Sequence, residues 1–448
     1  MADLLLRGAR VIDPFQGLDE VLDVAVSRGR VSEVGKGLSG EGREVLEAEG
    51  LVLSPGFLDM HVHLRDPGRE DEETLESGLE AAVRGGFTAV CCMPNTDPPL
   101  DNAPLVEDLV LRARGLGLAD LFPVGCVTRG REGKELAEMG LMFASAARVR
   151  AFSDDGDPVV DSGLMRRALQ YVRRFGGVII SHPEDVSLSR GGQVNEGRVS
   201  FALGLRSIPA LAEEVMVARD LLLAEETGAR LHLAHLSTAG SVRLLREAKA
   251  RGVRVTAEAT PHHLVLSELD IRDYDPVYKV NPPLRTPEDV KELRRALADG
   301  TLDAVATDHA PHSPEEKERE FDYAPFGVVG MESAFPVLYT QLVEKGELGL
   351  PVLIERLTLG PARALGLEPP DYGEGVRPGA RADLVLLDTV TEWVIDASAF
   401  ASRGKNCPFH GWKVRGRVVL TIKGGKVVYR APDYRWSREQ GEKVRERT

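Results

Sequence analysis

Cysteine is scarce in this sequence, and its scarcity limits the setting in which the protein works. Only four of the 448 residues are cysteine, and they form no C-x-x-C pair, the spacing typical of zinc ribbons and thiol-redox sites. Cys91 and Cys92 lie in the apolar run 89–93, where we expect buried thiols. The pattern argues against structural disulfides and predicts a reducing cytoplasm.

Long hydrophobic runs and basic clusters are missing as well. The N-terminal apolar run covers only residues 4–6, which is too short for a signal peptide or a membrane span. The formal net charge is −14, and no Lys/Arg-rich run with interleaved aromatic residues appears, so we expect no nucleic-acid partner. The remaining composition, 43% hydrophobic and 28% charged residues, is that of a globular protein with room for a large core.

The two ends of the chain share a texture of short, alternating strands. The N-terminal runs lie at residues 4–6, 11–13, 22–26 and 30–34, and the C-terminal runs lie at 382–387, 418–422 and 427–429. Because turns of Gly and Asp separate these runs, they are typical of strands. We predict domains at 1–53, 54–368 and 369–448, in which the two end segments, apart from a C-terminal tail, form one β-sandwich.

Between the ends, strand and helix patterns alternate. Strands are predicted at 57–63, 87–93, 121–126, 149–152, 178–181, 231–234, 254–257 and 304–307, with helices such as 211–227, 241–250 and 287–297 between them. Eight βα units over roughly 300 residues suit an α/β fold of the (β/α)₈ TIM-like barrel type, whose active site lies at the carboxyl ends of the strands.

Histidine and aspartate recur at those strand ends. His61 and His63 project from one face of the first strand, because strand residues alternate sides, and neutral imidazoles suit zinc. The later strand ends carry Asn95, Asp154 with Asp155, His182, His235 and Asp308. Each alone has a structural explanation, but together they predict a metal site.

That donor set exceeds the needs of one tetrahedral zinc ion, so we predict two ions sharing a hydroxide. One ion would be held by His61, His63 and Asp308 and the other by His182 and His235, with Asp155 able to bridge. His232 lies three residues before His235 and faces the opposite side, so we expect it to be structural. His262 and His263 are expected behind the ligands or in structural roles, and His410 is given no function.

Six segments together resemble a known family. They read HVHLRDPG at 61–68, MPNT at 93–96, FSDDG at 152–156, TPHHL at 260–264, NPPLR at 281–285 and ATDHAPH at 306–312. In this order they are similar to the signatures of bacterial class I dihydroorotases, barrel enzymes of the amidohydrolase superfamily. The resemblance covers nearly the whole chain, and it includes the split terminal sandwich.

The resemblance implies a reaction, a cofactor and partners. The reaction is the reversible hydrolysis of the cyclic amide of (S)-dihydroorotate to N-carbamoyl-L-aspartate, the third step of pyrimidine synthesis, with two zinc ions per chain. The family motif places its aspartate 27 residues before the strand-5 histidine, which selects Asp155 over Asp154. The implied substrate contacts are His63, Arg65, Asn95, Asn281, His312, Phe326 and Gly327. A second copy of the chain and aspartate transcarbamoylase are the implied protein partners, and both stay open.

The bridging residue separates this chain from similar enzymes. Hydantoinases, dihydropyrimidinases and many dihydroorotases resemble one another in a carboxylated lysine bridge. This chain has no lysine between Lys134 and Lys249, and Asp155 is already a carboxylate. One departure from the family pattern is Pro183, where cysteine is expected after the histidine. That position is not a ligand, so we expect little consequence.

The expected mechanism assigns a task to each group. The hydroxide attacks the ring carbonyl, which zinc polarises, and Asp308 takes the hydroxide proton and returns it to the leaving nitrogen as general base and acid. Arg65 would bind the substrate carboxylate, although a surface salt bridge to Asp66 or Glu70 is the alternative. The charged run 314–320 reads as a solvated face, and Phe326-Gly327 beyond it reads as a wall or lid.

Two other functions stay open at this point. Another cyclic amidase, such as a hydantoinase or allantoinase, would share the metal site, but it has no need of Arg65 and Asn95. A metal-free scaffold that supports another pyrimidine enzyme would lack ligands, whereas all six are present here.

Overall fold

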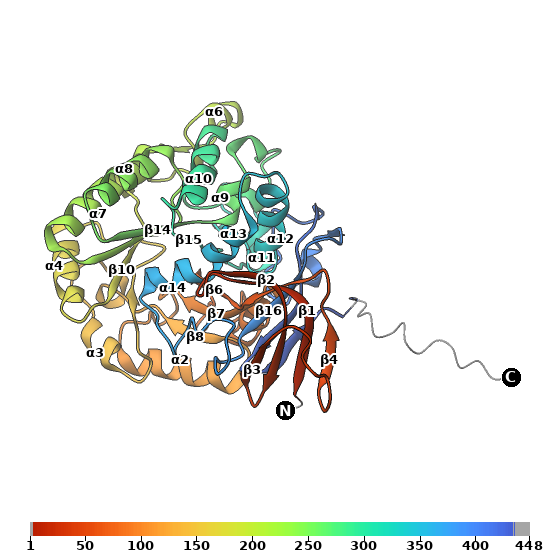
Figure 1. Ribbon diagram of the computed structural model, residues 1–448. Coiled ribbons are helices and arrows are strands. Elements are labelled where there is room, and N and C mark those ends of the chain that lie inside the picture. The colour runs from red at the N-terminus through yellow and green to blue at the C-terminus, as the bar shows by residue number, and fades with distance from the viewer. Residues whose placement is uncertain (1–2, 433, 435–448) are drawn as a thin grey trace.

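The computed structural model describes residues 3–432 and 434 (Figure 1). The last part of the predicted third domain, residues 435–448, lies outside the described residues. Among the described residues, no helix is long and apolar enough to cross a membrane.

Both ends of the chain enter one mixed sheet of eight strands within the described residues. Its order is β20-β19-β16-β5-β1-β2-β3, and β4 also pairs with β1. The strands are β1 (Leu4–Asp13), β2 (Leu18–Ser27), β3 (Arg30–Gly35), β4 (Glu44–Glu47), β5 (Val52–Pro55), β16 (Leu384–Asp388), β19 (Arg417–Lys423) and β20 (Lys426–Arg430). The antiparallel pair β5–β16 joins the two ends, and Figure 1 shows the red and blue strands side by side.

The two runs predicted at 4–6 and 11–13 are one strand, β1. Its pairing with β2 shifts between Leu6 and Ala9, where Gly8 has a φ of +72° and donates its N–H to Asp23 Oδ1 at 2.8 Å. Glycine adopts this left-handed conformation without strain, so the strand continues through the irregularity.

Eight strands of the central region form two parallel runs within the described residues. They are β6 (Phe57–Val62), β7 (Phe87–Cys92), β8 (Asp120–Pro123), β9 (Ala151–Phe152), β10 (Val178–Ser181), β13 (Arg230–Leu233), β14 (Val255–Ala259) and β15 (Ala304–Val305). Backbone hydrogen bonds join them into the runs β6-β7-β8 and β15-β14-β13-β10-β9. Parallel bridges Gly125–Phe152 and Val62–His309 connect the two runs at both ends, so the pairing returns to β6.

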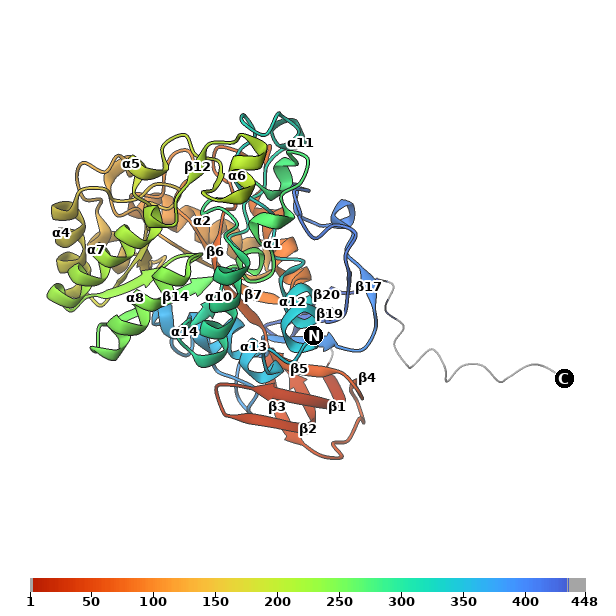
Figure 2. The ribbon, with the colours of Figure 1, turned by 90° about the horizontal axis from the view of Figure 1, so that it is seen from above.

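Helices cover the outside of these parallel strands (Figure 2). The longer ones are α1 (Leu75–Arg84), α2 (Ala103–Leu116), α4 (Ser162–Arg173), α7 (Leu211–Thr227), α8 (Ala239–Ala250), α10 (Pro287–Asp299) and α13 (Leu350–Leu357). Helix α14 (Leu359–Leu365) instead lies inside the ring of helices in Figure 1 and packs in one cluster with Met60 and Cys91. Shorter elements are α3 (Met139–Ala144), α5 (Val186–Ser189), α6 (Arg198–Leu203), α9 (Pro261–Val265), α11 (Pro314–Lys317), α12 (Ala334–Leu338), and the strands β11 (Val194–Asn195), β12 (Ser207–Ile208), β17 (Trp393–Val394) and β18 (Lys413–Val414). The alternation of strand and helix predicted for the central region is confirmed.

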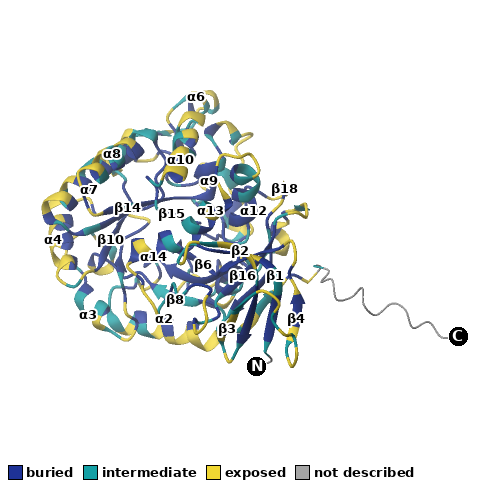
Figure 3. Cartoon of the chain, in the orientation of Figure 1, coloured by how far each residue is buried: buried dark blue, intermediate teal, exposed yellow. Residues whose placement is uncertain are grey.

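Helix α1 shows how sequence sets these boundaries. Thr74 caps its first turn in a reciprocal capping box with Ser77, and Leu75 and Leu79 turn a buried face inward. The helix ends at Gly85, as the Gly85-Gly86 pair indicates. Figure 3 shows the result for the outer helices in general, with buried inner faces and exposed outer faces.

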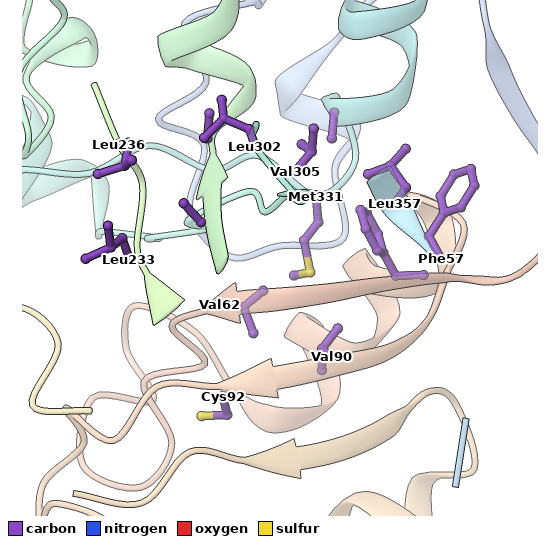
Figure 4. Packing of buried hydrophobic residues seen from close by; sticks show 14 of the residues in the cluster. Phe57, Val62, Val90, Cys92, Leu233, Leu236, Leu302, Val305, Met331 and Leu357 are labelled. Carbon is purple, nitrogen blue, oxygen red and sulfur yellow. The ribbon is translucent and has the colours of Figure 1, made fainter. Parts of the chain in front are cut away.

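The main core lies between the parallel strands and the helices. Figure 4 shows Val62 and Val90 of neighbouring strands together with Met331, Val305 and Leu357 in this cluster. Leu58, next to Phe57 on β6, and Cys91, next to Val90 on β7, belong to a second cluster, so both faces of these strands are buried, as expected for parallel strands under helices. The predicted buried thiols are confirmed, since the four described cysteines are buried and free.

Candidate metal centre and substrate pocket

The structure brings the six predicted ligands together at the carboxyl ends of the parallel strands. His61 lies on β6 and His63 follows it, and the other four lie one to three residues after the ends of β9, β10, β13 and β15: Asp155, His182, His235 and Asp308. The four histidines and Asp155 are buried, while the Asp308 side chain is 13% exposed. Asp154, the neighbour of Asp155, does not contact these histidines in the described structure. It accepts hydrogen bonds from Val127 N, Thr128 N and the Thr128 hydroxyl.

Asp155 lies between two pairs of histidines. Its Oδ2 is 3.4 Å from His61 Nε2 and 3.5 Å from His63 Nε2. Its Oδ1 is 3.5 Å from both His182 Nδ1 and His235 Nε2. Each pair with Asp155 forms a group whose ligand atoms lie within 4.8 Å of one another. One carboxylate therefore faces two potential cation sites, one with each oxygen.

Asp308 lies beside the first of these groups. Its Oδ1 is 3.0 Å from His63 Nε2 and 3.5 Å from His61 Nε2. The same side chain lines a cavity of about 360 Å³. Asp308 therefore contacts both the ligand cluster and the space where a substrate would sit.

The donor atoms fit divalent metal ions. Within the described part of the chain, His61 Nε2 and Asp155 Oδ1 are buried and have no hydrogen-bond partner, an arrangement that is costly unless a cation satisfies them. Burial alone would raise the pKa of Asp155, but the surrounding histidines lower it well below its usual range, so the carboxylate is ionised and ready to bind. Imidazole nitrogen with carboxylate oxygen is a donor set that suits zinc.

An outer layer of hydrogen bonds orients the imidazoles. His61 donates from Nδ1 to Glu258 Oε1 at 2.8 Å, and His63 donates from Nδ1 to Asn95 Oδ1 at 2.8 Å. His182 has the opposite ring orientation: its Nε2 donates to Glu184 Oε2 at 2.9 Å, and its Nδ1 faces Asp155 and lies 2.9 Å from His235 Nε2. Such bonds fix which ring nitrogen remains free as a ligand.

The sequence analysis missed Glu258 and Glu184. Glu258 is fully buried on β14, and the histidines His61 and His232 lower its pKa to about 2 against the effect of burial. An acidic residue inside the apolar strand 255–259 is a signal that would have found it, since a buried carboxylate needs a partner. Glu184 stands two residues after His182 and gives no comparable signal.

The remaining histidines lie around this centre or away from it. His232 bonds Thr256 Oγ1 at 2.8 Å and Glu258 Oε2 at 3.1 Å. His263 bonds Thr260 and donates to the Pro282 carbonyl at 2.8 Å, next to Asn281. His262 is buried, and burial lowers its pKa to about 4. His410 is 61% exposed and lies outside the pocket lining.

Three of the eight described non-glycine residues with positive φ lie at this site. Non-glycine residues with positive φ include Arg65 (59°), His235 (33°) and Asp308 (47°), a conformation that costs on the order of 1–3 kcal/mol each. Such strain persists only where surrounding contacts fix the backbone, and it is typical of functional sites.

The predicted substrate contacts line one cavity. Its walls include His63, Arg65, Asn95, Asn281, His312, Phe326 and Gly327, with Asp155, His182, His235 and Asp308 on the metal side. Gly327 has a φ of +132°, and a Cβ there would lie 2.8 Å from Ala310 Cβ and 3.0 Å from His312 Nε2. Only glycine fits at this point of the wall.

Arg65 has a different partner from either expected alternative. Its Nε lies 3.1 Å from Glu72 Oε2 and donates to the Pro311 carbonyl at 3.2 Å. Asp66 instead pairs with Arg112 at 2.6 Å, and Glu70 accepts the Gly68 N–H. The alternative of a surface bridge to Asp66 or Glu70 is wrong, because Arg65 turns into the pocket and Asp66 turns toward α2.

The segment that follows His312 is anchored on the pocket. His312 bonds Glu72 Oε1 at 2.8 Å through Nδ1 and donates from Nε2 to the Phe326 carbonyl at 2.7 Å. Lys317 is buried rather than solvated, with its ammonium donating to the carbonyls of Pro325 at 2.9 Å and Lys279 at 3.2 Å. The expectation that residues 314–320 form only a solvated face is therefore wrong at Lys317.

Comparison with known proteins adds relatives to this geometry. Residues 50–241 match the model of a family described as dihydro-orotase-like. The chain is 52% identical over 426 residues to a dihydroorotase from Pelotomaculum thermopropionicum, covering 95% of this chain and 98% of that one. It is 50% identical to a dihydroorotase from Geobacter metallireducens, covering 96% and 100%.

Solved structures resemble the whole chain too. An L-hydantoinase (dihydropyrimidinase) from Arthrobacter aurescens superposes with a TM-score of 0.85 at 29% identity, covering 96% of each chain. A dihydropyrimidinase from Brevibacillus agri, at 23% identity and a TM-score of 0.81 with 96% and 95% covered, shares the fold.

Proposed function

The chain belongs to the dihydroorotase family, and we propose how its residues open the substrate ring. It is a cyclic-amide hydrolase of pyrimidine biosynthesis, as relatives at about 50% identity over nearly its full length indicate. The reaction is the reversible hydrolysis of (S)-dihydroorotate to N-carbamoyl-L-aspartate. Water adds its hydroxyl to the ring carbonyl carbon, the C–N bond breaks, and the nitrogen gains a proton.

Our proposal for the metal centre is two zinc ions per chain. His61, His63 and Asp308 would hold one, and His182 and His235 would hold the other, with Asp155 shared. The observation that supports this most directly is that the two oxygens of Asp155 face different histidine pairs. When bound, the ions would generate a hydroxide nucleophile from water near neutral pH and polarise the ring carbonyl.

Asp308 is proposed as the general base and acid. Its carboxylate contacts His63 and reaches the cavity, so it can take a proton from the attacking water and deliver it to the leaving nitrogen. The neighbouring imidazoles, opposing the effect of burial, hold the pKa of Asp308 below its usual range. The carboxylate is therefore in its basic form when the substrate arrives.

The opposite end of the cavity is proposed to bind the substrate carboxylate. Arg65 supplies a guanidinium whose Nε is already occupied by Glu72 and Pro311, which holds it in place for a charge-assisted hydrogen bond through its outer nitrogens. Asn95, Asn281, His312 and the wall at Phe326-Gly327 complete this end.

We also propose the finer architecture and classification. The parallel pairing that returns to β6 supports a closed (β/α)₈ barrel over residues 54–368. The sheet shared by both ends supports a terminal β-sandwich domain formed by residues 1–53 and by the segment 369–448 apart from its C-terminal tail. An aspartate at position 155 supports the class I assignment. Self-association and binding of aspartate transcarbamoylase belong to the same proposal, and light scattering of the chain alone and with that enzyme would test both.

One pair of measurements tests the function. We expect about two zinc ions per chain by metal analysis, and hydrolysis of dihydroorotate in preference to hydantoin and dihydrouracil. Preference for hydantoin would contradict the substrate, and hydrolysis by a protein holding a single ion at saturation would contradict the shared centre.

A further inference from the structure

The position of the Asp155 carboxylate depends directly on its backbone. An aspartate has one methylene between the backbone and the carboxylate, so a shift of the loop moves the carboxylate by a similar distance. Bridging two ions about 3.5–4 Å apart therefore requires that loop 153–157 be held firmly. The question is what holds it.

The segment that follows β8 forms hydrogen bonds with the start of this loop. Val127 N and Thr128 N donate to Asp154 Oδ1 at 2.9 and 3.0 Å, and Val127 N also lies 3.3 Å from the Ser153 carbonyl. Within the loop itself, Asp155 N donates to Ser153 Oγ at 3.0 Å. These contacts fix the start of the loop.

Arg131 fixes the remainder. Its Nη2 donates to the Asp155 carbonyl at 2.8 Å, to the Asp154 carbonyl at 3.2 Å and to Asp157 Oδ2 at 2.8 Å. Its Nε lies 3.3 Å from the Asp154 carbonyl. The side chain is only 17% exposed. One guanidinium thus contacts three successive parts of the loop, including the peptide of the bridging residue itself.

The backbone conformation at Arg131 and Gly156 leaves room for this guanidinium. Arg131 has a φ of 58°, an uncommon value for a residue with a side chain. A Cβ at position 156 would lie 3.2 Å from Arg131 Nη2 and 3.3 Å from Asn95 Nδ2. Gly156 (φ +86°) therefore leaves room for Arg131 to pass between the loop and the pocket wall.

We propose that Arg131 is a positioning residue that holds Asp155 between the two histidine pairs and thereby strengthens binding of the metal pair. The inference rests on the two-ion centre proposed above. The proposal predicts that removing Arg131 changes the metal affinity in the direction opposite to the one that its charge alone would cause. A positive charge beside two cations disfavours them by simple Coulomb repulsion, so removing it should strengthen metal binding if charge were its main effect. A positioning role predicts weaker binding instead.

The test compares Arg131→Gln with Arg129→Gln. Arg129 lies in the same turn, is 64% exposed and pairs with Glu135, so its replacement is a matched control. Zinc affinities would be measured by competition with a chelator, and the Mn²⁺-loaded proteins by electron paramagnetic resonance, which distinguishes a coupled pair from isolated ions. We expect Arg131→Gln to weaken binding of the second ion at least tenfold and to lose the coupled signal. Arg129→Gln should match the unaltered protein.

Two further variants separate geometry from stability. Arg131→Lys keeps the charge and one donor to the Asp155 carbonyl, so it should fall between the unaltered protein and Arg131→Gln. Asp157→Asn removes an exposed partner of Arg131 but leaves its carbonyl contacts, so it should bind both ions normally. Melting temperatures of the metal-free proteins would show whether each variant is folded. If Arg131→Gln does not fold, the metal affinity of Arg131→Lys tests the positioning role instead.

The outcomes are distinct. Unchanged or tighter binding of both ions by folded Arg131→Gln would overturn the positioning role and leave the two-ion centre intact. An unaltered protein that binds fewer than two ions would overturn the proposed centre, whatever Arg131 does.

Discussion

The two ends of the pocket differ in whether their polar side chains already have hydrogen-bond partners. At the metal end, described ligand atoms such as His61 Nε2 and Asp155 Oδ1 are buried without hydrogen-bond partners. At the other end, Arg65 and His312 are already bonded to Glu72 and to the carbonyls of Pro311 and Phe326. The metal end is thus arranged for ions that complete it. At the other end, these contacts hold the side chains in position before the substrate arrives, so we expect less entropy to be lost on binding.

Replacing Asp308 should have the largest effect, because it acts where the two ends meet. We expect Asp308→Ala to lower kcat by roughly 10²–10⁴, the scale of a general acid and base. Steady-state assays paired with metal analysis would measure it. Near-normal turnover with both ions bound would show that neither the proton transfer nor metal binding depends on Asp308.

Replacing Arg65 tests the opposite end. We expect Arg65→Met to lower kcat/KM for dihydroorotate by about 10–150-fold, equivalent to a hydrogen bond to a charged group worth about 1.5–3 kcal/mol. Metal content should not change. Dihydrouracil, which lacks the carboxylate, is the control substrate, and an equal loss with both substrates would show that Arg65 does not read the carboxylate.

Replacing Glu258 tests the layer behind the metal end. It orients His61 and is not itself among the residues that line the cavity. We expect Glu258→Gln to weaken zinc binding by about 10–100-fold, as loss of an outer-layer partner does, with kcat restored at saturating zinc. Failure of added zinc to restore turnover would mean that Glu258 does more than orient the ring.

The acid stability of metal-free protein gives the smallest expected effect. Folding lowers the pKa of Glu258 from 4.5 to about 2, so its ionised form stabilises the fold above pH 4.5, and this contribution is lost as the pH falls toward 2. The melting temperature of chelated protein should therefore decline over that window, by a few degrees more than that of Glu258→Gln. If the melting temperatures of the two proteins fell equally with pH, this contribution of Glu258 would be refuted.

The sequence predicted the metal end better than the opposite end, for a physical reason. Strand periodicity placed His61, His63 and the later strand-end residues at one edge, because parallel strands end together. It could not supply Glu258, which meets His61 across 197 positions, since only the order of strands in space brings them together. The pairing of Arg65 with Glu72 was equally hidden, because near neighbours Asp66 and Glu70 are closer in sequence but turn elsewhere.

The β5–β16 pairing has a consequence for how the chain is made. Pro55 lies opposite Leu384, so a ribosome adding about 5–20 residues per second finishes β16 tens of seconds after β5. During that interval the edge of β5 has no permanent neighbour, and an unpaired edge invites pairing with other chains. We therefore expect the nascent chain to be exposed to such pairing until β16 is made, and a stop codon between β5 and β16 would leave that edge open permanently.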